Sequence, residues 1–91
     1  MKNASLRAEK GVIEVELATK ENSIVEIKIT GDFFIYPEEA IEDIEEILLG
    51  CSTSEKEIKT RINRLYQQKS LSTPGISIDD WVKVVTMAIA K

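Results

Sequence analysis

Residues 11–31 read GVIEVELATKENSIVEIKITG, and this stretch decides the fold. Apolar and polar side chains alternate through it twice, with a polar turn at residues 19–23 in between. Alternation with a period of two is typical of a strand that has one buried face. The apolar side chains expected on that face are Ile13, Val15 and Leu17 in the first strand and Val25, Ile27 and Ile29 in the second. The pattern therefore predicts an antiparallel hairpin with one face in water.

Three helical patterns follow the hairpin. Pro37 suits the first turn of the first helix, and Gly50 is a good stop just past its end. Ser54 and Glu57 have the spacing of a capping box for the second helix, which is expected to end by Lys69.

The third helix is expected to begin at Ser77, with Asp80 in its first turn, after a loop at residues 70–76. Strands followed by helices, rather than alternating with them, predict an α+β fold. In it, an antiparallel sheet of two or three strands precedes three helices that pack on one of its faces. The apolar segment at residues 33–36 is equally consistent with a short third strand and with a loop.

Length and composition predict one domain. Ninety-one residues can bury a modest core without disulfides or metal. Residues 1–9 lack periodicity and are expected to be a flexible arm, so that the domain spans residues 10–91. The chain shows no signal peptide and no apolar run long enough to cross a membrane, which predicts a cytoplasmic protein with no membrane partner.

The charge is unevenly distributed. The net charge is −4, which argues against nucleic acid as a partner. Residues 32–50 contain seven acids and no base. Such a segment can steer a basic partner, or it can simply be the solvated face of a helix.

No catalytic, cofactor-binding or metal-binding residue is predicted. The chain has no histidine, and its four glycines are too far apart to form a phosphate-binding loop. Cys51 is the one reactive candidate, because a helix start nearby can lower the pKa of a thiol. It has no histidine to activate it, so the simpler interpretation is a small apolar side chain that fills a gap.

Two adjacent aromatic residues, Phe33 and Phe34, lie on a segment expected to be extended. Neighbouring side chains of an extended chain point to opposite sides. One ring can therefore fill the core while the other is left outside for a partner, unless both are buried. Tyr36 is open to the same two interpretations, and Trp81 is expected to anchor the third helix to the sheet.

Together these stretches resemble a known family, the C-terminal accessory domain of lipoate-protein ligases. Residues 10–15 (KGVIEV) look like its opening strand. Residues 27–34 (IKITGDFF) look like its second strand with a Gly-Asp-Phe-Phe motif, and residues 41–50 (IEDIEEILLG) are similar to the acidic helix that follows. The resemblance implies a fold of the SufE/NifU type.

The resemblance also implies a function. The accessory domain works with a catalytic domain that binds lipoate and ATP with Mg, forms lipoyl-adenylate and modifies a lysine of a lipoyl carrier domain. This chain would be the non-catalytic small subunit of a split ligase, would form a heterodimer with the catalytic subunit, and would be required for the activation step. It would itself bind no cofactor and would meet the lipoyl carrier domains only indirectly.

The motif suggests which residues face the partner. Those carried over as candidates for the interface, or for shaping its loop, are Gly31, Asp32, Phe33 and Phe34; Tyr36, which lies outside the motif, is a further interface candidate. Two alternatives remain open: a sulfur-transfer or iron–sulfur scaffold protein of the same fold that uses Cys51, and a generic adaptor domain.

Overall fold

Three strands precede three helices in the computed structural model, which describes residues 1–91. The strands are β1 (Lys2–Ala8), β2 (Gly11–Lys20) and β3 (Ser23–Asp32). The helices are α1 (Ala40–Leu48), α2 (Glu55–Lys69) and α3 (Ile78–Ile89). This order confirms the predicted α+β fold, and the sheet has three strands.

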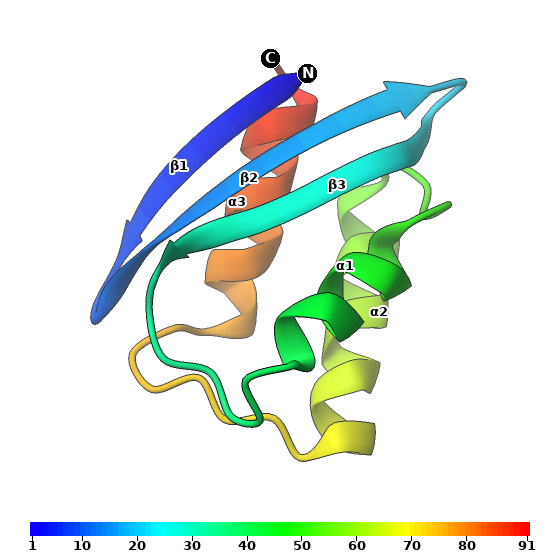
Figure 1. Ribbon diagram of the computed structural model, residues 1–91. Coiled ribbons are helices and arrows are strands. Elements are labelled where there is room, and N and C mark those ends of the chain that lie inside the picture. The colour runs from blue at the N-terminus through cyan, green and yellow to red at the C-terminus, as the bar shows by residue number, and fades with distance from the viewer.

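The sheet is antiparallel and has the order β1-β2-β3. Figure 1 shows the three helices on one side of it. Helix α3 packs beneath β1 and β2, α1 packs against β3, and α2 packs against the other two helices. The opposite face of the sheet is left open, as the alternation in the sequence predicts. No helix is both long enough and apolar enough to cross a membrane.

The core lies between the sheet and the helices. Ile13, Val15 and Leu17 of β2 are fully buried, whereas Glu14 and Glu16 between them are exposed. All 20 buried residues are apolar and form one cluster. Each large side chain that is fully buried contributes roughly 1.5–3 kcal/mol, so this cluster is the main source of stability.

The expected arm at residues 1–9 is wrong, because Lys2–Ala8 form the edge strand β1. Ala4 is buried, and Leu6 and Ala8 are half-buried on the same face. These side chains are too small and too few to produce a clear alternation, so the strand was recognisable only from its pairing with β2.

The second strand of the hairpin departs from the predicted pattern at one residue. Val25 was expected inside but is 46% exposed, whereas Ile24 is fully buried. The register shifts between Ala18 and Thr19, which leaves Val25 without a partner. This bulge reverses the alternation, because an extra residue turns every side chain beyond it to the other face.

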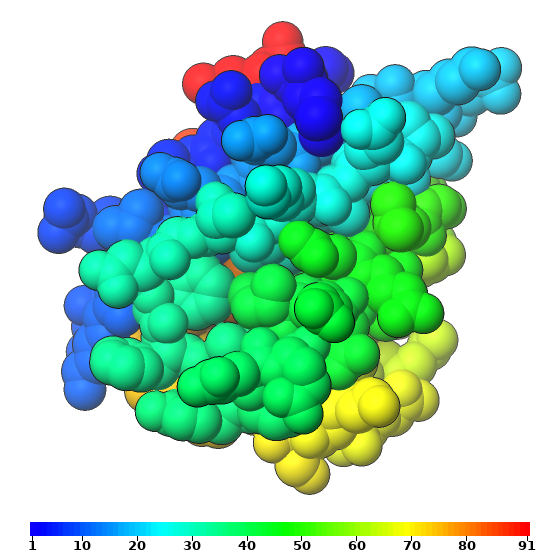
Figure 2. Space-filling model, viewed as in Figure 1, coloured from blue at the N-terminus to red at the C-terminus, as the bar shows by residue number.

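Residues 33–36 form a connecting segment and not a third strand. A single bridge between Tyr36 and Ser72 is its only ladder contact. The segment lies at the surface on the face seen in Figure 2, where it is drawn in blue-green. Helix α1 then begins at Ala40, later than Pro37, whose carbonyl oxygen accepts a hydrogen bond from the Ala40 N–H at 3.0 Å.

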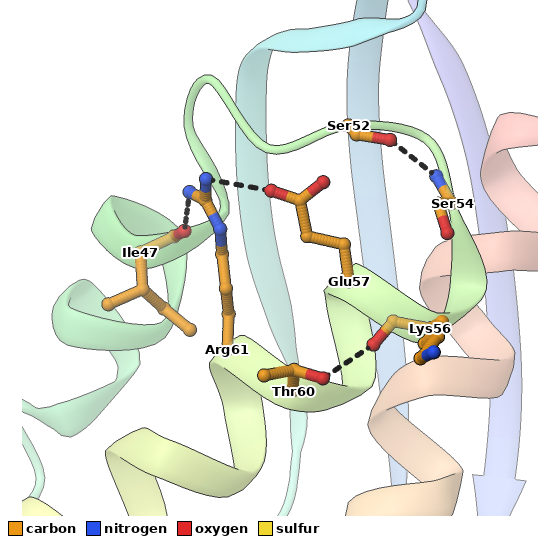
Figure 3. Close-up of polar contacts among 7 residues, drawn as sticks. All are labelled: Ile47, Ser52, Ser54, Lys56, Glu57, Thr60 and Arg61. Atoms are coloured by element: carbon orange, nitrogen blue, oxygen red, sulfur yellow. Dashed lines mark hydrogen bonds and ion pairs between the residues drawn. The ribbon is translucent and has the colours of Figure 1, made fainter.

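The helix starts confirm one predicted cap and correct another. Ser77 forms a full capping box with Asp80 at α3. Ser54 precedes α2 but makes no side-chain cap. In Figure 3 the Ser54 N–H donates to the Ser52 hydroxyl oxygen at 3.0 Å, and the Glu57 carboxylate accepts a hydrogen bond from Arg61 at 2.9 Å, so neither half of the capping box forms.

Candidate functional site

The turn out of β3 requires glycine at Gly31. Its φ is +142°, which side chains rarely allow, and a Cβ atom there would lie 2.2 Å from the Val12 carbonyl oxygen on β2. The two strands therefore approach closely at this point. Asp32 follows as the exposed last residue of β3, and the chain leaves the sheet at Phe33. The motif Gly31-Asp32 thus shapes the loop that carries the aromatic residues.

Phe33 points toward the core. Its ring packs edge-to-face against Trp81 on α3, with the ring centroids 5.5 Å apart and the planes at 90°. This geometry suits the charge distribution of two aromatic rings. Trp81 is fully buried, so Phe33 and Trp81 together join the loop, α3 and the sheet. Trp81 therefore anchors α3, as the sequence predicts.

Phe34 and Tyr36 point outward. The side chain of Phe34 is 65% exposed and that of Tyr36 is 52% exposed, whereas Ile35 between them is buried. This arrangement answers the question that the sequence left open, since one of the two adjacent phenylalanines is half-buried and the other is outside. We call Phe34 and Tyr36 the aromatic pair.

The backbone that carries the aromatic pair is hydrogen-bonded to a second loop. The Tyr36 N–H donates to the Ser72 carbonyl oxygen at 2.9 Å, and the Ser72 N–H donates to the Tyr36 carbonyl oxygen at 3.0 Å. Ser72 belongs to the loop at residues 70–76 between α2 and α3. This loop thus fixes the segment that carries the aromatic pair.

A chain of side-chain hydrogen bonds fixes that loop in turn. The Trp81 Nε1–H donates to the Tyr66 hydroxyl oxygen at 2.6 Å, and the Tyr66 and Thr73 hydroxyls are 2.8 Å apart. Thr73 donates its own proton to the Ile76 carbonyl oxygen at 2.8 Å. Because a hydroxyl has one proton, Tyr66 must be the donor to Thr73. All three bonds therefore run in one direction, from the core to the loop.

Burial has shifted the pKa of Tyr66. Desolvation raises the pKa above its ordinary value, and the hydrogen bonds to Thr73 and Trp81 oppose that rise. The hydroxyl therefore stays protonated at neutral pH, as its role as a donor requires.

Cys51 is a core residue. It is fully buried, and desolvation is the main reason that the pKa of its thiol lies above 9.0, although the positive charge of Arg61 opposes the shift. A reactive cysteine has the opposite properties, namely a lowered pKa and access to solvent. The structure therefore agrees with the interpretation of Cys51 as an apolar filler.

The acidic segment lies mostly on the surface of α1. Glu42 and Glu46 are exposed, but the Glu45 carboxylate accepts a hydrogen bond from the Ile29 N–H of β3 at 2.7 Å. This helix therefore contributes both a solvated face and one contact that fixes it to the sheet.

A groove of about 280 Å³ lies between α1 and α2, lined by Glu46, Ile47, Arg61, Arg64, Leu65 and Gln68. The guanidinium of Arg61 is already engaged there, since it donates to the Ile47 carbonyl oxygen and to Glu57, both at 2.9 Å (Figure 3). It holds the end of α1 against α2 instead of offering a binding group. No group of three or more His, Cys, Asp or Glu side chains is arranged to hold a metal ion.

The five residues singled out in the sequence have different places in the structure: Gly31 shapes the turn, Phe33 packs inward against Trp81 instead of facing a partner, and the exposed ones are Asp32, Phe34 and Tyr36. Sequence reasoning missed Tyr66, Ser72 and Thr73, which support the segment at residues 33–36 from elsewhere in the chain. Tyr66 lies on a helix face and Ser72 and Thr73 lie in a loop, so no local pattern links them. The one available signal was that buried tyrosine and tryptophan need polar partners.

The comparisons with known proteins agree with the resemblance drawn from residues 10–50. The family model described as bacterial lipoate protein ligase C-terminus matches residues 1–84. Lipoate-protein ligase A subunit 2 of Thermoplasma acidophilum is 35% identical over 85 residues, which cover 93% of this chain and 87% of that protein.

A solved structure gives the same result. It comes from a study of an archaeal lipoylation system, a bi-partite lipoate protein ligase and its E2 lipoyl domain from Thermoplasma acidophilum. The two chains superpose with a TM-score of 0.85 and 35% identity, over 91% of each. Sequence and fold therefore lead to the same conclusion: this chain belongs to the lipoate protein ligase C-terminal family.

Proposed function

We propose that this chain is the small accessory subunit of a two-protein lipoate-protein ligase and acts bound to a separate catalytic subunit. The support is the similarity over most of the chain to a ligase subunit 2 and to a structure from a bi-partite ligase. Membership of the family by itself supports a role of this chain in lipoylation. The division of labour between the two subunits is the proposal.

In this proposal the catalytic subunit binds lipoate and ATP with Mg²⁺. Lipoate displaces pyrophosphate from ATP to give lipoyl-adenylate, and the lipoyl group then passes to a lysine of a lipoyl carrier domain with release of AMP. This chain supplies no reacting group. It is required for the first step, because docking it onto the catalytic subunit holds that subunit in the geometry that forms the adenylate.

The aromatic pair is the observation that carries the docking role. Large apolar side chains are normally buried, and aromatic residues are enriched where proteins meet. Phe34 and Tyr36 are exposed on a backbone segment that is already held by hydrogen bonds to Ser72. A surface ordered in advance loses little conformational entropy on binding, which favours association.

The sulfur-transfer and iron–sulfur alternatives receive no support from the structure. Both need an accessible thiolate, whereas Cys51 is fully buried and its pKa is raised. A generic adaptor would also use the aromatic pair to bind a partner. Binding therefore does not distinguish the two functions, and the test is an assay of adenylate formation.

Pyrophosphate release from ATP and lipoate tests the proposal. We expect none from this chain alone, little from the catalytic subunit alone, and rapid release from the mixture. An activity of the catalytic subunit that does not change when this chain is added contradicts the proposal. Copurification of the two chains in the same preparations separates failure to bind from binding without activation.

A further inference from the structure

The two edges of the sheet differ in how their backbone groups are used. At the β3 edge, the Ile24 N–H donates to the Cys51 carbonyl oxygen at 2.9 Å, and the Gly50 N–H donates to the Ile24 carbonyl oxygen at 2.7 Å. The Ile29 N–H of the same strand donates to Glu45. This edge is covered by α1 and the loop after it. In Figure 1 no element lies beyond β1 at the other edge.

The pairing shows which groups of β1 are free. Residues of an antiparallel strand direct their backbone groups alternately to one neighbour and to the other. The Ile29 N–H points away from β2, so its partner Val15 must direct its backbone groups toward β1 and bond with Ala4. The residues on either side of Ala4 then direct their groups outward.

Three residues, Asn3, Ser5 and Arg7, therefore present their N–H and C=O groups at the open edge. The turn and side-chain hydrogen bonds of the protein include none of these groups. Proteins usually protect such an edge with proline, a bulge or inward-pointing charge. Strand β1 has no proline and its register with β2 is regular. Its two charged side chains, Lys2 and Arg7, lie towards its two ends, and the Lys2 ammonium, on the same face as Ala4, is engaged with the Ile89 carbonyl oxygen at 3.0 Å.

We propose that the β1 edge pairs with the β1 edge of a second copy of this chain, antiparallel and centred on Ser5. Two three-stranded sheets then join into one sheet of six strands. In this register Ser5 faces Ser5 of the second copy, and Asn3 faces Arg7 of the second copy. No like charges meet directly, which is the condition for stable cross-strand pairs.

The charges on the open face complement one another in this register. Asn3 pairs with Glu16 of β2 within each copy. Arg7 of the second copy therefore lies in the same row as Glu16, two strand spacings or about 10 Å away, a span that the two long side chains cover together. Neither Arg7 nor Glu16 has an ion pair within the protein, and both are exposed.

The face that packs on the helices is also complementary. Ala4 meets Leu6 of the second copy, a small side chain against a larger one. Leu6 is half-buried in the single chain, and α3 packs beneath β1. Pairing extends this apolar layer across the new contact. The aromatic pair follows β3, which forms the opposite edge of the sheet.

Sedimentation of the full chain from micromolar to millimolar concentration tests the pairing. We expect a weak, reversible dimer, since seven residues a side form a small interface. Ser5→Pro removes the central N–H, which has no partner within the chain, so the monomer should keep its fold. Dimerisation should weaken by roughly tenfold or more, because two hydrogen bonds are lost. Ser5→Ala keeps the N–H and should dimerise normally.

A charge variant keeps the test valid even where proline disturbs β1. Arg7→Glu should weaken the dimer by repulsion from Glu16, whereas Lys20→Glu makes the same change of charge at the far turn and should leave it intact. A chain that stays monomeric at every concentration overturns the proposal, as does a dimer insensitive to both Ser5→Pro and Arg7→Glu. A monomeric chain that needs Ser5 to bind the catalytic subunit overturns it too, because the edge then belongs to that partner.

Discussion

The inner and outer sides of the segment at residues 33–36 differ in what they contact. On the inner side, Phe33 packs against Trp81, which is fully buried and hydrogen-bonded to Tyr66. On the outer side, Phe34 and Tyr36 face solvent. The alternation of an extended chain thus separates stability from recognition within four residues. Changes on the inner side should cost folding free energy, and changes on the outer side should cost binding free energy.

The largest effect is expected on the inner side, from Trp81→Ala. Removing this fully buried ring takes away the partner of Phe33 and the donor to Tyr66, and we expect a loss of about 3–5 kcal/mol in the free energy of unfolding. Urea unfolding followed by circular dichroism measures it, since the variant has no tryptophan fluorescence. Trp81→Phe, which keeps a ring, should lose less. A loss below about 1 kcal/mol for the alanine variant would show that Trp81 is not the anchor.

Phe34→Ala should have the next largest effect, on the outer side. As an interface anchor it should cost about 2 kcal/mol, or roughly thirtyfold in affinity for the catalytic subunit, while the melting temperature of the free chain stays unchanged. Phe33→Ala should show the reverse, with a lower melting temperature.

Val25→Ala is the matched control for Phe34→Ala, because Val25 is also an exposed apolar residue, at 46%, but lies on β3 near the hairpin turn. It should bind the catalytic subunit normally. Equal losses of affinity for Val25→Ala and Phe34→Ala, measured by calorimetric titration, would place the interface elsewhere.

Tyr66 connects Trp81 on the inner side to the loop that holds the outer side. Tyr66→Phe should have a smaller effect than Trp81→Ala or Phe34→Ala. It leaves the Trp81 Nε1–H buried without an acceptor and Thr73 without its donor, at a cost of about 1–2 kcal/mol in stability. The loop at residues 70–76 should also loosen, which faster amide exchange at Ser72 would report. Unchanged exchange at Ser72 together with lower stability would mean that the hydrogen bonds stabilise the core without positioning the loop.

The smallest effect is expected from alkaline pH. Burial raises the pKa of Cys51 above 9.0 and that of Tyr66 above 10.0, so the folded chain holds both protons more tightly than the unfolded chain does. Stability from this source is therefore complete below pH 9 and falls as the pH rises through and above these values. Urea unfolding from pH 8 to 11 should show the decline, and Cys51→Ala with Tyr66→Phe should reduce it. A stability that is independent of pH in this range would contradict the shifts.

Local patterns in the sequence determined much of the architecture. Alternation identified β2, a helical stripe identified each helix, and Ser77 with Asp80 identified the start of α3, because each of these features depends on neighbours within a few residues. The prediction that only one of Phe33 and Phe34 faces inward rests on the same local geometry.

Tertiary structure decided what depends on distant residues. Strand β1 is defined by its pairing with β2, and the bulge at Val25 is a shift in the register between β2 and β3. Which phenylalanine is inside depended on Trp81, 48 positions further along the chain. The hydrogen bonds from Trp81 through Tyr66 to Thr73 join two helices and a loop. Such contacts form only when the core brings these elements together, so no local pattern in the sequence can encode them on its own.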